Sequence, residues 1–264
     1  MNKFNRYPEF KDKVVLVTGA ASGIGEAVVS ELRAHCRCWQ WDLSFGEPSA
    51  YRQPVNIAEP VEVERAFQKL LATEKHIDYL VHCAGKFSAQ PLLGSDNPVE
   101  EFSQLWQANT LGTLNVTSIV GRQMKQQRQG SMVVVSSNAA STPRTNMGFY
   151  GASKAAASYL TRVLALELAP FGVRCNLVSP GSTLTNMQRQ FWQSLGGTSQ
   201  DLENEFIERV IEGDLSQHRL GIPLNKMAQP KDIADTILFL LSDSAGHITL
   251  ENIVVDGGAT LGFG

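Results

Sequence analysis

Tyr150 and Lys154 are the two residues of this 264-residue chain whose types and spacing first point to chemistry. Side chains four residues apart lie on one face of a helix, so the phenol and the ammonium would be neighbours. A free phenol has a pKa of about 10 and is a weak base at neutral pH. A nearby cation stabilises the phenolate, and the pair therefore indicates proton abstraction from an alcohol. The same spacing also occurs by chance on exposed helices, so the surrounding sequence has to decide.

A glycine-rich turn predicts a phosphate-binding site near the amino terminus. Residues 18–25 follow a short aliphatic strand, expected at 14–17, and open a helix expected from 24 to about 34. Gly19, Gly23 and Gly25 permit a tight turn and close approach of the backbone to a pyrophosphate, which the positive end of the helix favours. A glycine-rich turn without a ligand is the alternative.

Asp42 ends the second expected strand, at 38–42. A carboxylate at that position can accept hydrogen bonds from an adenosine ribose diol, and it would repel a 2′-phosphate. Because Ser22 stands inside the glycine turn in place of a basic residue, the sequence favours NAD over NADP. A solvated aspartate at a strand end is the alternative.

Strands and helices alternate along the chain. Further strands are expected at 79–82, 132–136, 175–179 and 253–255, and further helices at 61–75, 99–127, 151–169 and 231–241. This order predicts a single-domain α/β protein with a Rossmann-type, doubly wound parallel sheet and helices on both faces. Residues 190–220 are polar and lack a strand pattern, so we expect a mobile substrate lid of weak helices at about 186–222.

The composition is that of a soluble globular protein, with 43% hydrophobic residues, 19% charged residues and a net charge of -3 at pH 7. With no basic excess, neither nucleic acid nor an anionic membrane surface is an expected partner. No apolar run approaches the roughly 18 residues that a membrane span needs. We therefore expect a cytoplasmic protein that binds small molecules.

The cysteines do not suggest a metal site or disulfides. They lie in apolar or strand-like segments, as reduced cysteines of a cytosolic protein do; they are Cys36, Cys38, Cys83 and Cys175. Cys36 and Cys38 lack a partner pair at zinc-site spacing, and the five histidines are scattered. No metal is expected.

Taken together, the glycine turn, Asp42 and the Tyr150/Lys154 pair resemble the short-chain dehydrogenase/reductase family over essentially the whole chain. Asn109 in residues 109–112, Ser137, residues 180–181 and residues 255–258 match it as well. The resemblance implies that Tyr150 removes the alcohol proton and that Ser137 orients the substrate oxygen. It also implies that Lys154 lowers the pKa of the tyrosine and binds the nicotinamide ribose, while Asn109 supports a proton-relay water. In isolation, Ser137 could simply end a strand and Asn109 could cap or kink a helix.

The family pattern places further cofactor contacts at Ile24, Asn56, Ile57, Ala84, Gly85, Thr183 and Thr185. The chain departs from that pattern twice. His82 and Cys83 stand where the family usually carries asparagine or alanine, and Asn56 replaces an aspartate that meets the adenine amino group. An amide carbonyl can still accept that hydrogen bond, so we expect altered adenine contact. His82 is expected to pack at the strand end and not to act as a catalyst.

Residues 141–144, 180–189, 220–226, 247–250 and 253–258 resemble one subfamily, the 2,3-dihydro-2,3-dihydroxybenzoate dehydrogenases of catecholate siderophore pathways. This implies oxidation of a small carboxylated cyclohexadiene diol, whose ketone then tautomerises to a catechol. The carboxylate needs a cation, and Arg144 is the first candidate because a guanidinium binds carboxylates bidentately; a solvated loop arginine is the alternative. Gln188 and Arg189 in the lid and Met147 as an apolar wall complete the expected substrate contacts, with Ser137 and Tyr150 at the reacting oxygen.

Other functions remain open on the sequence alone. A 3-oxoacyl carrier protein reductase, or another short-chain alcohol dehydrogenase, would share the fold and the catalytic residues. A noncatalytic protein that senses a nucleotide or scaffolds a partner is a further alternative. The resemblance also implies a homotetramer, with the long helices and the carboxyl-terminal strand region as interfaces.

Overall fold

The fold confirms the predicted doubly wound sheet. The computed structural model describes residues 8–194, 196, 200–217 and 219–261. In these residues seven strands form one parallel sheet, in the order β3-β2-β1-β4-β5-β6-β7. The strands are β1 (Val14–Thr18), β2 (Arg37–Trp41), β3 (Arg52–Gln53), β4 (Tyr79–His82), β5 (Gly130–Val135), β6 (Val173–Pro180) and β7 (Asn252–Val255).

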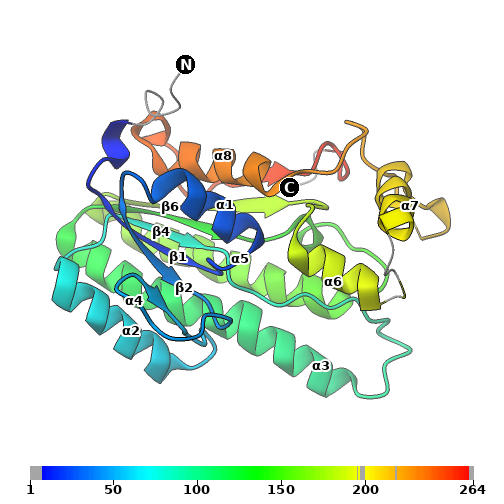
Figure 1. The fold of residues 1–264 in the computed structure, drawn as a ribbon, viewed down its shortest axis with the longest axis horizontal. Coiled ribbons are helices and arrows are strands. Elements are labelled where there is room, and N and C mark those ends of the chain that lie inside the picture. Colours follow the sequence, from blue (N-terminus) through cyan, green and yellow to red (C-terminus); the bar gives the residue numbers. More distant parts are fainter. Residues whose placement is uncertain (1–7, 195, 197–199, 218, 262–264) are drawn as a thin grey trace.

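Helices cover both faces of the sheet (Figure 1). α1 (Gly23–Leu32) and α8 (Pro230–Leu241) pack on one face, and α2 (Pro60–Glu74), α4 (Gly112–Gln127) and α5 (Gly148–Leu168) pack on the other. α3 (Pro98–Leu105) precedes α4, and short helical turns lie at Pro8–Phe10, Asn138–Ala140, Ala169–Phe171, Leu215–Gln217 and Asp243–Ala245.

The interior strand β1 shows why the sequence adopts this arrangement. All of its residues are buried, with Val15 and Val17 in the core under α1 and α8, and Val14 and Leu16 in the core under α2, α4 and α5. A strand covered on both faces has no polar side and reads as a continuous aliphatic run. The functional residues follow the carboxyl ends of such strands.

Three elements differ from the sequence-based expectation. β3 has two residues and no apolar pattern, so it was not predicted. The single helix expected at 99–127 is interrupted by η3, a π-helical segment at Trp106–Leu111. β2 ends at Trp41, so Asp42 follows the strand directly and is not its last residue.

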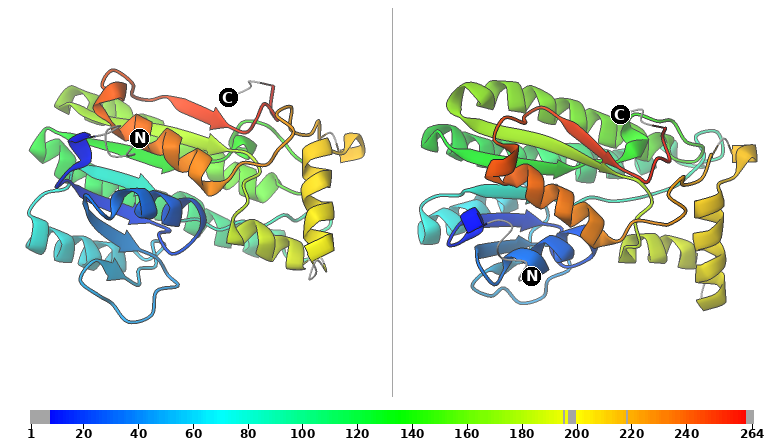
Figure 2. Two further views of the ribbon diagram at one scale, coloured as in Figure 1. Left: turned by 45° about the horizontal axis from the view of Figure 1, so that its top comes forward. Right: turned by 90° about the horizontal axis from the view of Figure 1, so that it is seen from above.

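The predicted lid region contains two helices with a small core of their own. α6 (Asn186–Ser194) and α7 (Gln200–Glu212) stand at the end of the sheet to which the strand arrows point (Figure 2). Trp192 stacks on Phe206 with ring centroids 5.8 Å apart, and both belong to a third apolar cluster with Val210 and Ile222. Packing of this kind gives α6 and α7 a defined place relative to each other.

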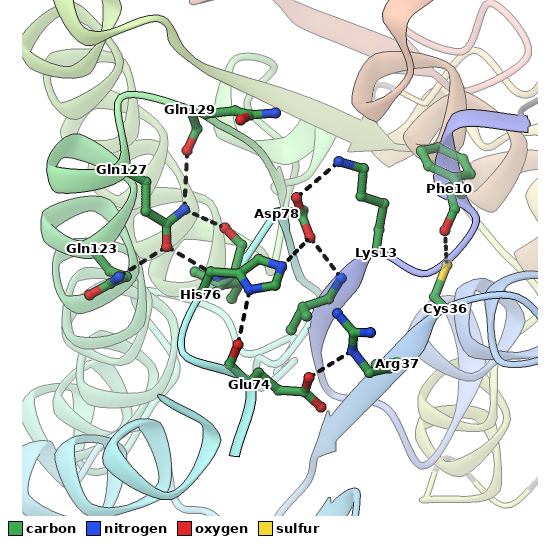
Figure 3. A network of polar contacts seen from close by, with 12 residues as sticks. Phe10, Lys13, Cys36, Arg37, Glu74, His76, Asp78, Gln123, Gln127 and Gln129 are labelled. Carbon is green, nitrogen blue, oxygen red and sulfur yellow. Dashed lines mark hydrogen bonds and ion pairs between the residues drawn. The ribbon is translucent and has the colours of Figure 1, made fainter. Parts of the chain in front are cut away.

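At the opposite end of the sheet, Asp78 holds the starts of β1 and β4 together (Figure 3). Its carboxylate accepts hydrogen bonds from the Val14 backbone N at 2.8 Å and from the Lys13 Nζ at 3.2 Å. His76 Nε2 lies 3.2 Å from the same carboxylate. Asp78 is 9% exposed, so this network is a structural feature far from the strand ends where chemistry is expected.

Asp78→Ala should destabilise the fold by about 2 kcal/mol, because the buried Val14 N–H loses its acceptor. Lys13→Ala removes only a partly exposed ion pair from the same carboxylate and should cost under about 1 kcal/mol. Urea unfolding of both variants measures the difference. Equal losses would show that charge pairing, and not the backbone hydrogen bond, is what Asp78 provides.

Candidate active site

The first turn of α5 packs directly against the turn that follows β5. A Cβ on Gly151 would lie 2.7 Å from the Ala139 carbonyl oxygen, so only glycine allows this approach. Ser137 precedes this turn in extended conformation and caps it by accepting a hydrogen bond from the Ala139 N at 3.2 Å. Tyr150 is the residue before Gly151, and its phenol is near enough to the Ser137 side chain for that hydroxyl to lower its pKa.

Burial acts on the two ionisable groups of α5 in opposite directions. Burial raises the pKa of the Tyr150 phenol above its usual value, and the Ser137 hydrogen bond lowers it in part. Burial also lowers the pKa of Lys154 to about 8, with Cys83 opposing that change. The Lys154 Nζ donates to the Val135 carbonyl at 3.0 Å and is 6% exposed. In both cases the low-dielectric surroundings disfavour the charged form.

The π-helical segment η3 fixes Asn109 against the same helix. Asn109 is fully buried, and its amide exchanges two hydrogen bonds with the Lys86 backbone, at 2.8 and 2.9 Å. Its Nδ2 also donates to the Ser153 Oγ at 3.0 Å, and that hydroxyl donates to the Tyr150 carbonyl at 2.8 Å. Every polar atom of the Asn109 side chain therefore has a partner, and the side chain cannot turn without breaking them.

Gly85 lies between Asn109 and Lys154. A Cβ there would stand 2.8 Å from the Asn109 Oδ1 and 3.3 Å from the Lys154 Nζ. The structure thus brings together the four residues expected to be catalytic, which come from η3, the turn after β5 and α5. A buried phenol, a hydroxyl, an amide and an ammonium in one place can bind an alcohol oxygen and exchange its proton.

The glycine turn forms a cradle that fits a dinucleotide pyrophosphate. Gly19 has a φ of 66°, and a Cβ on it would lie 2.7 Å from the Ala84 N. A Cβ on Gly25 would lie 2.1 Å from the Gly19 carbonyl oxygen, so the turn closes tightly on α1. Ser22 is the N-cap of α1 but makes no side-chain capping hydrogen bond. Ile24 follows in the first turn, whose N–H groups and positive dipole end suit an anion.

Asp42 is tied to this turn. Its Oδ2 accepts from the Ala21 N at 3.0 Å, and its Oδ1 accepts from the Ser44 N at 2.9 Å and the Ser44 Oγ at 2.7 Å. These contacts hold a partly exposed carboxylate beside the cradle. A carboxylate has about four lone-pair sites, so Asp42 can still accept from a ribose hydroxyl.

The other residues expected to contact a cofactor make the following contacts. Thr185 lies over the turn, since a Cβ on Gly23 would be 3.1 Å from its Cγ2, and Thr183 is buried and donates to the Gly181 carbonyl at 3.1 Å. On the adenine side, the Asn56 Oδ1 accepts from the Ala58 N at 3.1 Å. The Ile57 carbonyl accepts from the Asn115 Nδ2 at 3.0 Å, so Ile57 supports the loop through packing.

Two of the expected substrate residues line a cavity beside α5. It has a volume of about 590 Å³ and includes Arg144 and Met147, together with Leu92 and Leu93. Gly151 reaches it, but Tyr150 and Ser137 do not line it, so this cavity adjoins the catalytic residues without enclosing them.

Arg144 carries a charge that the described residues do not neutralise fully. Its Nε is buried and, in the part of the chain that the structure describes, has no hydrogen-bond partner. Burial, and then the nearby guanidinium of Arg219, lower the pKa of Arg144, while the Asp256 carboxylate raises it in part. Two guanidinium groups close together in a partly buried place favour an anion between them.

Arg219 was missed by sequence reasoning. It lies in a hairpin closed by backbone hydrogen bonds with Asp214, at 2.8 and 2.9 Å. Gly213 and Gly221 flank this hairpin at positive φ, and their backbones pack so closely that a Cβ on Gly213 would be 2.3 Å from the Gly221 N. No motif marks Arg219, because its approach to Arg144 depends on this packing.

Arg189 and Gln188, expected to contact the substrate, make different contacts in the structure. Arg189 is ion-paired with Glu203 of α7, with Nε and Oε1 2.9 Å apart, so its charge already has a partner. The Gln188 N donates to the Thr185 Oγ1 at 3.2 Å, which places Gln188 at the start of α6 next to the cofactor cradle.

Phe87 is a second residue that the sequence did not reveal. Its ring meets the Tyr150 ring edge to face at 5.0 Å and the Phe191 ring of α6 at 5.1 Å. The aromatic row joins Tyr150 to α6, and it can exclude water from the phenol.

Comparison with known proteins agrees with this geometry. A family described as enoyl-(acyl carrier protein) reductase, within the short-chain dehydrogenase/reductases, matches residues 19–260. The chain belongs to the short-chain dehydrogenase/reductase family. It is therefore an oxidoreductase of a family that uses nicotinamide cofactors.

Three relatives illustrate the similarity. Vibriobactin-specific 2,3-dihydro-2,3-dihydroxybenzoate dehydrogenase of Vibrio cholerae serotype O1 is 45% identical over 262 residues, covering 94% of this chain and 95% of that protein. The 2,3-dihydro-2,3-dihydroxybenzoate dehydrogenase of Escherichia coli K12 is 44% identical over 260 residues, covering 96% and 99%. Ligand-free aldohexose dehydrogenase of Thermoplasma acidophilum superposes with a TM-score of 0.86 at 26% identity, covering 97% and 96%.

Two further features of this dehydrogenase concern the requirements of a metal site and of a membrane span. Among the described residues no three His, Cys, Asp or Glu side chains come together as a metal site would need. None of the described helices combines the length and apolar character needed to cross a membrane.

Lys154→Met should stabilise the protein at neutral pH. The pKa of Lys154 is about 8 in the folded protein and 10.5 ordinarily. Between pH 8 and pH 10.5 the unfolded chain therefore binds one more proton at this residue than the folded protein does. Wild-type stability therefore rises with pH across this window, and below pH 8 folding has to bury an ammonium. The variant should be more stable by roughly 1–3 kcal/mol near pH 7 and should match wild type near pH 10.5. Urea unfolding at several pH values measures this, and a pH-independent difference would contradict it.

Proposed function

We propose that this enzyme oxidises 2,3-dihydro-2,3-dihydroxybenzoate to 2,3-dihydroxybenzoate with NAD, in the cytoplasm, as a step of siderophore biosynthesis. The observation that carries the proposal is the 44–45% identity, over nearly the whole chain, to two enzymes named for this substrate. The free cysteines of the described residues are typical of a reducing compartment.

In the proposed reaction, Tyr150 is the general base for the ring alcohol. Its phenol lies near the Ser137 hydroxyl, so a substrate oxygen that bridges the two would be held in line for proton transfer. Lys154, four residues away on α5, favours the phenolate electrostatically when its amine is protonated. Asn109, fixed by η3, holds the backbone at Lys86 in place and supports a water that passes the proton on.

Asp42, Gly19, Gly23, Gly25 and Ile24 would hold the cofactor, and Thr183 and Thr185 would contact it as well. The nicotinamide ring, when bound, accepts the hydride from the carbinol carbon. Asp42 supports NAD over NADP, because its carboxylate stands beside the glycine cradle, where it would repel a 2′-phosphate. The ketone that forms tautomerises to the catechol, and aromatisation draws the reaction toward product.

Arg144, with Arg219 beside it, is the proposed carboxylate site. The buried Nε of Arg144 without a hydrogen-bond partner supports this role, whereas Arg189 already pairs with Glu203. Because Arg219 belongs to the region at about 186–222, we propose that this region acts as the substrate lid and that it carries the second guanidinium. Met147 and Phe87 supply apolar walls for the ring.

We further propose a homotetramer. The outward faces of α4 and α5 carry exposed apolar side chains, among them Tyr159 at 70% and Leu166 at 60% exposure, with Leu114, Leu160 and Val163. A soluble chain covers a patch of this kind by association, and symmetric assembly is the usual form.

Turnover tests the proposed function directly. Purified protein with NAD and 2,3-dihydro-2,3-dihydroxybenzoate should produce NADH absorbance and catechol fluorescence together, with kcat/KM higher for NAD than for NADP. Turnover of 3-oxoacyl or enoyl substrates with NADPH, and none of the diol, would favour the carrier-protein reductase that the family description names. Binding of NAD without any turnover would favour a nucleotide-sensing protein.

Arg144→Ala and Arg219→Ala should each raise KM for the carboxylated diol by about 10- to 100-fold, because a charged hydrogen bond is worth roughly 1.5–3 kcal/mol. A cyclohexadiene diol that lacks the carboxylate should be oxidised by both variants as by wild type. Arg189→Ala is the matched control in the proposed lid. It should change KM for the carboxylated diol, and KM for the diol without a carboxylate, by less than about tenfold. Equal losses on the charged and the neutral diol would remove the proposed role of the two arginines.

A further inference from the structure

His82 is a buried histidine that the proposed reaction does not use. It is the last residue of β4, is 1% exposed, and stands where the family usually carries an asparagine. Its two ring nitrogens contact hydroxyls on opposite sides: Nδ1 is 2.9 Å from the Thr18 Oγ1 and Nε2 is 3.0 Å from the Thr113 Oγ1. The imidazole thus bridges the end of β1 and the first turn of α4.

The direction of the hydrogen bond at Nε2 follows from the Thr113 hydroxyl. Thr113 donates its only hydroxyl proton to the Asn109 carbonyl, at 2.6 Å. Its oxygen can then only accept from His82, because a hydroxyl has one donor. Nε2 therefore carries a proton.

The direction at Nδ1 follows from the charge of the ring. Burial, and then the Lys154 ammonium, lower the pKa of His82 to about 3, so the imidazole is neutral and Nδ1 has no proton. Thr18 must donate to it. The Thr18 oxygen in turn accepts from the Ala84 N at 3.3 Å.

The result is a directed chain of four hydrogen bonds in which every group has its partner. It runs from the Ala84 N–H to Thr18, from Thr18 to His82, from His82 to Thr113, and from Thr113 to the Asn109 carbonyl. Its first residue, Ala84, packs on Gly19 of the glycine cradle. Its last is Asn109 in η3. Hydrogen bonds in such a buried chain polarise and reinforce one another.

We propose that His82 is a positioning residue, whose neutral, Nε2-protonated imidazole sets the place of Asn109 relative to the dinucleotide turn. The chain spans the two sides of the site, because Thr18 leads into the turn and Thr113 holds the carbonyl of the residue expected to support the proton relay. The consequence for catalysis rests on the proposed function; the tautomer does not.

The tautomer can be read by nitrogen-15 NMR of histidine-labelled, cofactor-free protein. The chain contains five histidines, and the His82 signal is the one absent from His82→Gln. We expect a protonated Nε2, a bare Nδ1, and no titration between about pH 5 and pH 8, where an ordinary histidine changes charge. A proton on Nδ1, or titration in this range, would overturn the inference whether or not the protein oxidises the diol.

Kinetics test the positioning role with matched threonines. Thr113→Val breaks the chain, whereas Thr117→Val removes a buried hydroxyl that makes the same type of bond one turn later, to the Thr113 carbonyl at 2.8 Å. Misplaced catalytic groups can cost up to about 100-fold in rate, so Thr113→Val should lower kcat at least about tenfold while leaving NADH affinity within about twofold. Thr117→Val should change kcat less than about twofold. Equal effects of the two variants on kcat would contradict the proposal.

His82 variants supply the rescue test. His82→Leu removes both hydrogen bonds, whereas the amide of His82→Gln can reach as far as Nε2 and can still donate to Thr113. We expect kcat to fall at least about tenfold in His82→Leu and to recover in part in His82→Gln, at similar thermal stability of the two variants. Identical kcat values in both variants would show that His82 only fills space.

Discussion

The close approach of α5 to the turn after β5 is the constraint on which the site depends. Only glycine fits at position 151, where a Cβ would lie 2.7 Å from the Ala139 carbonyl oxygen. That contact brings Tyr150 near Ser137, and one helical turn later the Lys154 Nζ donates to the Val135 carbonyl. The sheet supplies the other half of the geometry, because parallel strands bring the glycine turn, Gly85 and Ser137 to one edge.

Burial disfavours the charged forms of Tyr150 and Lys154 on α5. It raises the pKa of Tyr150 and lowers that of Lys154, so the protein alone disfavours both the phenolate and the ammonium. An opposite charge nearby offsets the cost of burying the phenolate or the ammonium. The low dielectric that disfavours a single buried charge also strengthens the attraction between two opposite charges. Oxidised nicotinamide held by the residues proposed for it would add a positive charge that favours the Tyr150 phenolate. In this proposed mechanism Tyr150 acts as a base only when the oxidised cofactor is bound.

Sequence reasoning succeeded where chemistry is encoded in local patterns. The strand and helix order followed from aliphatic runs and glycine punctuation. Spacing singled out Tyr150 and Lys154, whereas Asn109 and Ser137 came from the family resemblance; all four converge in the structure. It did not predict elements and side chains whose positions depend on packing between segments far apart in the sequence. β3 is two residues without an apolar signal, and η3 breaks a continuous helical pattern because Asn109 and Thr110 dock on α5. Arg219 and Phe87 become relevant only through neighbours far away in the chain.

In the proposed mechanism, Tyr150 becomes an accessible base through the charges placed around it and not through the protein alone. Ultraviolet difference titration of wild type against Tyr150→Phe, with and without NAD, measures the ionisation of this one phenol. The account predicts that Tyr150 ionises above the ordinary tyrosine range of about 10 in the cofactor-free protein, and well below it with NAD bound. An ionisation that NAD leaves unchanged would contradict the account.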